Sequence, residues 1–269
     1  MKTLCARHGV TRAGYYSFRR REPSVHARQD ERLLQRIRAV FETSEGTYGS
    51  PRIHAALQQA GLRVGCKRVA RLMRSAALKA RSARIYRRAP GTRRFFAAIP
   101  NRVLGLNTTA PGQIWVGDVT YLRSAGRWRY LAVVLDRHSR RVLGWSLRLR
   151  RDLTLTRLAL NRALPRQRPR PGLIFHSDRG VEYSAYSFRA RLAALGITQS
   201  MKRPREICDN AFAESFFHSM KSDVIHGRIF DDDHSLNVVV SRYLRRYNLT
   251  RRHSSLGFLS PIHYERNAA

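Results

Sequence analysis

Apolar residues change their spacing along this chain near residue 113. Upstream, in residues 29–43 and 48–80, they recur every three or four positions, as on one face of an amphipathic helix. Downstream, short apolar runs rich in β-branched and aromatic residues alternate with turn residues, as the strands of a sheet do. The pattern predicts a helical N-terminal region followed by an α/β region. Two more short helices are expected within residues 1–22, on either side of Gly9.

Residues 48–80 predict a helix–turn–helix, the motif that places its second helix on DNA. Ser50 and Pro51 begin the first helix, and Gly61 ends it. In the second helix, residues 65–74, the apolar side chains share one side and the cations share the other. Such cations contact phosphates and base edges, although a basic face that is only solvated has the same pattern. The candidate DNA-binding residues are Arg52, Lys67, Arg68, Arg71 and Arg74.

Beyond residue 113 the predicted elements follow the order βββ-α-β-α-β-α. Strands are expected at residues 114–122, 128–135, 141–147, 173–178 and 197–201, and helices at 152–164, 184–195 and around Glu214. This order is typical of a mixed sheet with helices packed on it. A last helix is predicted at residues 231–248, where three aspartates are expected to cap its start rather than to bind metal. The tail after it carries cations such as Arg251, which would either hold a phosphate or pack against the core.

The charge of the chain points to a nucleic acid as its partner. Its 269 residues include 52 Lys and Arg against 18 Asp and Glu, which gives a net charge of +34. Repulsion on that scale opposes folding unless a polyanion relieves it. No apolar run is long enough to span a bilayer, Arg7 and His8 interrupt the apolar stretch near the N-terminus, and Cys5, Cys66 and Cys208 are too scattered for a disulfide framework. We therefore expect a cytoplasmic protein with no membrane partner.

Three acids in this basic chain are candidates for a metal site. Asp118 lies within an apolar, β-prone run, Asp178 closes another, and Glu214 lies on a helix that Asp209 is expected to cap. Three carboxylates on separate elements can hold two divalent cations about 3.5–4 Å apart, and hard oxygen ligands suit Mg²⁺ or Mn²⁺. Any one of these acids alone could instead be an ordinary surface residue or a helix cap. For all three together that interpretation is weaker, because the chain has few acids.

These motifs resemble those of the insertion-sequence-three family of bacterial transposases, whose core is similar to retroviral integrase. The resemblance lies in residues 115–121, 176–183, 209–217 and 247–257, with residues 48–54 and 67–73 upstream. The interval of 35 residues between Asp178 and Glu214 also matches the Asp-Asp-Glu pattern of the family. The resemblance implies a ribonuclease-H-like α/β fold, with a mixed five-stranded sheet flanked by helices and preceded by an all-α helix–turn–helix region.

The resemblance also implies a reaction and the residues that perform it. Asp118, Asp178 and Glu214 would be catalytic and would bind two Mg²⁺ or Mn²⁺ ions. The implied activity is hydrolysis at the end of an insertion element, followed by attack of the freed 3′ hydroxyl on another phosphodiester.

Three further residues are expected beside these acids. Lys221 would contact DNA next to the site, and Asn210, one helical turn before Glu214, would share its face. His176 would position a phosphate or a water, with a hydrogen-bonded histidine at a strand end as the alternative.

The predicted organisation has four parts. They are a DNA-binding region at residues 1–80, a basic linker at 81–113, a catalytic core at 114–230, and a C-terminal helix and basic tail at 231–269. The partners that the resemblance implies are double-stranded DNA and further copies of the chain, because two element ends must meet. It also implies a product of an upstream frame, which in this family usually carries a coiled coil; no heptad run is present here. The alternatives are an inactive DNA-binding protein or regulator of element ends, and a nuclease for RNA–DNA hybrids.

Overall fold

The computed structural model describes residues 1–20, 22, 24–81, 99–203 and 210–267. Residues 82–98 of the predicted basic linker, and Asp209, the expected cap of the Glu214 helix, lie outside the described residues. The chain divides into two units, Met1–Ala80 and Arg81–Ala269. Residues 231–269, predicted as a separate C-terminal segment, therefore belong to the second unit.

The first unit is helical, as predicted. It contains α1 (Lys2–Arg7), α2 (Arg12–Arg20), α3 (Val25–Thr43), α4 (Ser50–Gln59) and α5 (Cys66–Ser75). The apolar faces of α3, α4 and α5 share one core, which includes Ile37, Ile53, Leu57, Val69 and Leu72. The turn between α4 and α5 is held by a hydrogen bond of 2.8 Å between His54 Nε2 and the Val64 carbonyl oxygen. The α4–turn–α5 arrangement is the predicted helix–turn–helix.

The second unit is built on a mixed sheet whose strand order, within the described residues, is β3-β2-β1-β4-β5. The strands are β1 (Ile114–Ser124), β2 (Arg127–Asp136), β3 (Val142–Arg148), β4 (Ile174–Ser177) and β5 (Thr198–Met201). The first three form an antiparallel meander, while β4 runs parallel to β1, and β5 runs parallel to β4. The predicted mixed five-stranded sheet is confirmed.

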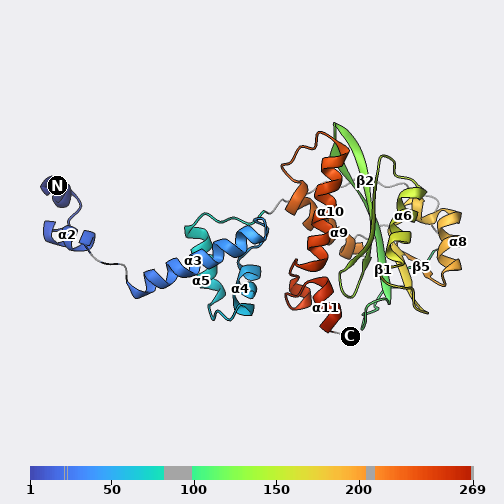
Figure 1. The fold of residues 1–269 in the computed structure, drawn as a ribbon, viewed down its shortest axis with the longest axis horizontal. Coiled ribbons are helices and arrows are strands. Elements are labelled where there is room, and N and C mark those ends of the chain that lie inside the picture. The colour runs from blue at the N-terminus through green and yellow to red at the C-terminus, as the bar shows by residue number, and fades with distance from the viewer. Residues whose placement is uncertain (21, 23, 82–98, 204–209, 268–269) are drawn as a thin grey trace. The chain divides into compact units, whose positions relative to one another are not determined.

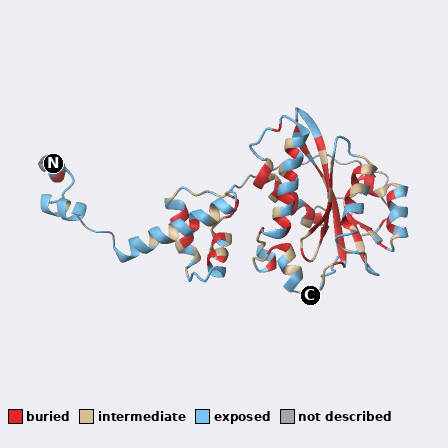
Figure 2. Ribbon diagram, viewed as in Figure 1, coloured by how far each residue is buried: buried red, intermediate tan, exposed pale blue. Residues whose placement is uncertain are grey.

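Helices cover both faces of this sheet (Figure 1). One face packs against α6 (Leu153–Ala163), α7 (Val181–Ser184) and α8 (Tyr186–Ala194), and the other against α9 (Ala211–Met220) and α10 (Asp233–Leu249). Trp115 of β1 enters the first core and Val116 the second, because successive side chains of a strand point to opposite faces. The strands consequently form a buried centre between two helical layers (Figure 2).

Glycine allows α6 to pack directly on the backbone of β3. A Cβ atom at Gly144 would lie 2.1 Å from the Ala159 carbonyl oxygen and 2.6 Å from the Ala163 nitrogen. Both atoms belong to the helix backbone, which cannot turn aside as a flexible side chain can. A residue without a Cβ is therefore required at this crossing.

The predicted helix at residues 184–195 corresponds to α8, and the sequence pattern did not predict the separate short helix α7 that precedes it. Ala185, between α7 and α8, has an extended backbone with ψ 136°. Tyr183 and Phe188 both stack on Phe175, with ring centroids 5.9 and 5.5 Å away. Side chains five residues apart on a continuous helix point about 140° apart, so the break lets both rings reach the same core.

Helix α9 also differs from the prediction at its ends. Asn210 occupies the N-cap position of α9 and makes no capping hydrogen bond with its side chain. At the other end, α9 runs into one turn of π-helix, η2 (Lys221–Ile225), which the sequence pattern did not predict. As expected, an aspartate caps α10: Asp232 accepts a hydrogen bond of 2.7 Å from the Ser235 N–H.

The C-terminal tail is fastened to the sheet by buried polar contacts. The Asn248 side chain makes two hydrogen bonds of 2.8 Å with the backbone of Val142 in β3. Arg251 is buried and pairs with Asp223 of η2 at 2.9 Å. Of the two roles considered for Arg251, packing against the core is therefore the one seen. A short helix, α11 (Pro261–Asn267), ends the described chain.

Candidate active site

The pairing of β1 with β4 brings two of the candidate acids side by side. The two strands are parallel, and Gly117 is the partner of Ser177. Asp118 and Asp178 are the next residues on each strand, so they reach the same level on the same face of the sheet. A Cβ atom at Gly117 would lie 2.5 Å from the Phe175 ring, so the absence of a side chain at this position leaves room for that ring.

Glu214 joins this pair from helix α9. The buried side of α9 contributes Ala213, Phe216 and Phe217 to the core on the α9 face of the sheet, and Glu214 is exposed. Asp118 is buried, and this burial, together with the charge of Asp178 and to a smaller extent that of Glu214, raises the pKa of Asp118 to about 8. Asp178 and Glu214 therefore both lie within electrostatic range of Asp118.

The two aspartates are also held by local backbone bonds. Asp118 Oδ1 accepts a hydrogen bond of 2.8 Å from the Val119 N–H, and Asp178 Oδ1 accepts one of 3.0 Å from the Gly180 N–H. Burial and the charge of Glu182 raise the pKa of Asp178. Both carboxylates thus have an unfavourable environment for negative charge, which a bound cation would relieve.

The donor chemistry of the site suits a hard divalent cation. Three carboxylates, from two strands and one helix, offer oxygen ligands of the kind that Mg²⁺ and Mn²⁺ prefer. Among the residues that the structure describes, however, no three His, Cys, Asp or Glu side chains are grouped closely enough to hold an ion. The fold thus brings the acids to one side of the sheet, but in this structure their side chains are not close enough together to coordinate one ion.

Lys221 lies within electrostatic range of Asp118. Its ammonium group stands 4.6 Å from the centre of the Tyr121 ring, a favourable cation–π distance. Burial lowers the pKa of Lys221, while the nearby charge of Asp118 opposes that shift. Its contact with DNA stays a prediction.

Glu182 was not predicted as a site residue. Its side chain is fully buried, and Oε1 pairs at 2.7 Å with Arg151, whose Nη2 atom also lies 3.8 Å from Asp178 Oδ2. Within the described residues, the other oxygen of Glu182 has no hydrogen-bond partner. The signal in the sequence was an acid four positions after Asp178 in a chain that has few acids.

The two predicted supporting residues have different surroundings. His176 is buried, and its Nδ1 atom lies 2.9 Å from Ser200 Oγ, which in turn accepts a hydrogen bond from the Arg102 N–H. This is the environment of a hydrogen-bonded histidine on a strand. Asn210 is also buried, but among the described residues its Oδ1 atom has no hydrogen-bond partner.

The five candidate DNA contacts of the first unit have three kinds of surroundings. Arg68 and Arg71 both pair with Asp30 of α3, at 2.7 and 2.6 Å, and their hydrogen bonds lower the pKa of Asp30. Lys67 and Arg74 are exposed on α5. The remaining candidate, Arg52 of α4, lies over the Tyr48 ring at 5.8 Å.

The chain matches descriptions of known domain families along most of its length. An HTH-like domain matches residues 28–86, and two descriptions of an integrase core domain match residues 108–206 and 195–261. Within the described residues, no helix is both long enough and apolar enough to cross a membrane.

Several bacterial relatives are similar over nearly their whole length. An uncharacterized 31 kDa protein of insertion element IS600 from Shigella sonnei is 36% identical, over 96% of each chain. The transposase InsF of insertion sequence IS3A from Escherichia coli K12 is 35% identical, over 98% of this chain and 93% of the relative. The transposase of insertion sequence element IS904 from Lactococcus lactis is 33% identical, over 91% and 98%.

Solved structures with a similar backbone include viral integrases. The integrase catalytic core domain of HTLV-2, solved in complex with magnesium, has a TM-score of 0.47 and 16% sequence identity. The similarity covers 59% of this chain and 99% of that domain.

Proposed function

This chain belongs to the insertion-sequence-three family of transposases, and we propose that Asp118, Asp178 and Glu214 are the catalytic acids with which it cleaves and joins DNA. The reaction class is phosphoryl transfer: hydrolysis of a phosphodiester at an element end, then attack of the freed 3′ hydroxyl on a second phosphodiester. The observation that carries the proposal is the parallel pairing of β1 and β4, which sets Asp118 beside Asp178 within the electrostatic range of Glu214.

We propose that two Mg²⁺ or Mn²⁺ ions are held by these three carboxylates. When bound, such ions would activate the attacking oxygen and stabilise the leaving oxygen of an in-line displacement. The raised pKa values of Asp118 and Asp178 support this assignment, because buried carboxylates that repel one another bind a cation in place of a proton.

The other residues of the site act on the DNA backbone. Lys221 lies within electrostatic range of Asp118, where its charge would attract the phosphate that is to be cut. Arg151, held by Glu182, keeps a positive charge 3.8 Å from Asp178 and would limit the free movement of that carboxylate. In the first unit, Lys67 and Arg74 are exposed on the second helix of the helix–turn–helix and would contact the element end.

The proposal is tested by cleavage of a labelled duplex that carries the terminal repeat, in the presence of Mn²⁺. We expect Asp118→Asn, Asp178→Asn and Glu214→Gln each to lower the rate by at least about a hundredfold while DNA binding persists. Asp231→Asn and Glu31→Gln are matched controls, because both acids are exposed and distant in sequence from the three. A variant that cleaves at the wild-type rate would remove its residue from the mechanism.

We also propose that the active form contains at least two copies of the chain, because two element ends must be brought together for joining. Mass measurement by light scattering, with and without DNA carrying paired ends, tests this. A complex containing one copy that nevertheless joins two ends would contradict it. A product of the upstream frame is a further proposed partner, tested by whether its addition increases end joining.

A further inference from the structure

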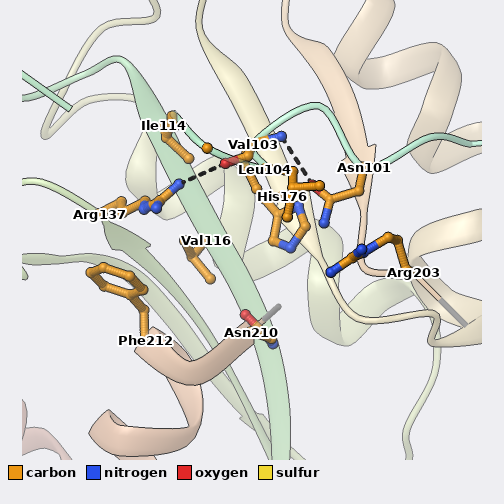
Figure 3. A pocket seen from close by; sticks show the side chains of 11 residues that line it. Asn101, Val103, Leu104, Ile114, Val116, Arg137, His176, Arg203, Asn210 and Phe212 are labelled. Carbon is orange, nitrogen blue, oxygen red and sulfur yellow. Dashed lines mark hydrogen bonds between the residues drawn. The ribbon is translucent and has the colours of Figure 1, made fainter. Parts of the chain in front are cut away.

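A cavity of about 300 Å³ lies on the α9 face of the sheet (Figure 3). Ile114 and Val116 of β1 and His176 of β4 line it. Val116 and His176 stand two residues before Asp118 and Asp178, so they share a face of the sheet with those acids, roughly 7 Å away along each strand. The described lining residues include none of the three acids, so the cavity adjoins the candidate active site as a separate space.

The walls of the cavity are mostly apolar and come from two further segments. Asn101, Val103 and Leu104 precede β1, and Asn210 and Phe212 lie at the start of α9. Small-molecule sites have volumes of about 300–1,000 Å³, so this cavity is at the small end of that range. It has room for one flat ring system, and a base pair with its backbone would be too large.

One polar atom in the wall lacks a partner. Asn210 has only 2% of its surface exposed, and within the described residues its Oδ1 atom accepts no hydrogen bond. Figure 3 shows this oxygen on the side of Val116. A buried acceptor without a partner is unfavourable, and it needs an N–H or O–H donor. A phosphate diester offers only acceptors, whereas the edge of a nucleobase offers N–H groups.

Two arginines lie over the ring of Phe212, and one of them, Arg137, also lines the cavity. The guanidinium carbons of Arg137 and Arg140 lie 4.9 and 4.0 Å from the centre of the Phe212 ring. Arg137, which lines the cavity, also donates a hydrogen bond of 3.4 Å to the Val103 carbonyl oxygen. In the described part of the chain neither arginine pairs with a carboxylate, and burial lowers the pKa of both. Two cations without an acidic partner suit a phosphate.

We propose that this cavity receives one unpaired nucleotide of a bound DNA end, with its base against Asn210 and its phosphate beside Arg137 and Arg140. A base N–H group would supply the donor that Asn210 Oδ1 lacks. The apolar walls, which include Val103, Leu104 and Val116, would contact the faces of the base. A base inside a duplex is stacked and cannot enter, so the cavity selects a base that is flipped out or lies in an overhang. The inference rests on the proposed function in assuming that the DNA end lies across Asp118.

The test compares two hairpin duplexes of the same sequence, one blunt and one with a 5′ overhang of a single 2-aminopurine nucleotide. Binding to the full-length protein is measured in EDTA, so that no strand is cut. We expect the wild type to bind the overhang duplex roughly tenfold more tightly than the blunt one, which corresponds to one stacked base. The fluorescence of 2-aminopurine should change as its base leaves the neighbouring pair.

Two variants and a control test whether the preference for the overhang depends on the cavity. Asn210→Leu removes the acceptor, and Leu104→Trp narrows the cavity from a rim residue that is 58% exposed and therefore changeable without unfolding the core. Both should lose the preference for the overhang and keep the affinity for the blunt duplex. Asn237→Leu, the same substitution on an exposed position of α10, should change neither.

The outcomes separate this inference from the proposed function. Equal affinity of the wild type for the two duplexes, or an unchanged preference in both variants, overturns the cavity assignment even if Mn²⁺-dependent cleavage is observed. Absence of cleavage by the wild type, together with a preference that Asn210→Leu removes, would refute the catalytic proposal and retain the nucleotide site.

Discussion

Replacing Asp118 with asparagine should stabilise the metal-free protein at neutral pH and remove its response to metal. Burial and the charge of Asp178 raise the pKa of Asp118 from 3.8 to about 8. The folded chain therefore keeps this proton over a range of pH in which the unfolded chain releases it. The stability contributed by the group is fully present below pH 4 and is lost progressively as the pH rises toward 8.

The size of the effect follows from the same shift. Between the ordinary pKa of 3.8 and pH 7 there are about 3 pH units, each worth about 1.36 kcal/mol. Relative to a neutral side chain of the same shape, Asp118 thus lowers the free energy of unfolding at pH 7 by at most about 4 kcal/mol. Asparagine removes this effect and retains an oxygen for the Val119 N–H.

Tryptophan fluorescence during urea unfolding measures this change selectively. All three tryptophans, Trp115, Trp128 and Trp145, belong to the second unit, so the first unit does not contribute to the signal. We expect Asp118→Asn to match the wild type at pH 4 and to exceed it by about 2–4 kcal/mol at pH 7. Added Mn²⁺ should stabilise the wild type at pH 7 and leave the variant unchanged, because the cation favours the carboxylate.

A control and a contrary result complete this experiment. Asp231→Asn changes an exposed acid and should leave the dependence of stability on pH as in the wild type. If the wild type and Asp118→Asn lose stability in parallel between pH 4 and pH 8, the Asp118 carboxyl group is not held protonated by its surroundings. The reasoning from burial and mutual repulsion would then be refuted.

Three further changes test other parts of the structure. Arg251→Met should lower the free energy of unfolding by about 3–5 kcal/mol, because it leaves the Asp223 carboxylate buried without its cation. The same urea experiment measures this loss, and the double variant with Asp223→Asn should recover part of it. Asp30→Ala should release two arginines of α5, so that the affinity for a DNA duplex falls more steeply with salt concentration, by up to about two phosphate contacts. Binding titrations at several salt concentrations measure this slope, and an unchanged slope would show that these arginines do not reach DNA. Gly144→Ala should destabilise the second unit by roughly 2 kcal/mol or more, because its Cβ would overlap the backbone of α6, and a wild-type melting temperature would contradict the close packing seen there.

Much of the fold could be predicted because it depends on local signals. The apolar runs, the turn at Gly126 and the change from helical to strand spacing placed the strands to within a few residues. The break at Ala185 could not be predicted in this way, because it is set by the two rings that must reach Phe175. Helix spacing reports which side of a helix is apolar, but not whether two apolar residues fit the same core.

In the candidate site, too, some features could be predicted from local signals and others depend on the assembled fold. Asp118 and Asp178 were recognisable as acids in or at the end of apolar runs, but the register that sets them level is a property of the assembled sheet. Glu182 was overlooked because nothing local distinguishes a buried acid from a solvated one. Its burial becomes evident only once Arg151, thirty-one residues earlier in the chain, is seen to pair with it.

Helix α9 links the cavity, the acids and the C-terminal tail. Its first turn carries Asn210 at the cavity and Glu214 toward the aspartates, and its last turn continues into η2. There Asp223 accepts hydrogen bonds from Arg251 and from the Tyr243 hydroxyl, both of them buried. The C-terminal end of α9 is therefore fixed by ionic contacts inside the core, whereas Glu214 is exposed near the start of the helix. A nucleotide bound at Asn210 would act on the same turn that carries Glu214, so occupation of the cavity and the position of the third acid are expected to be coupled through a single helical turn.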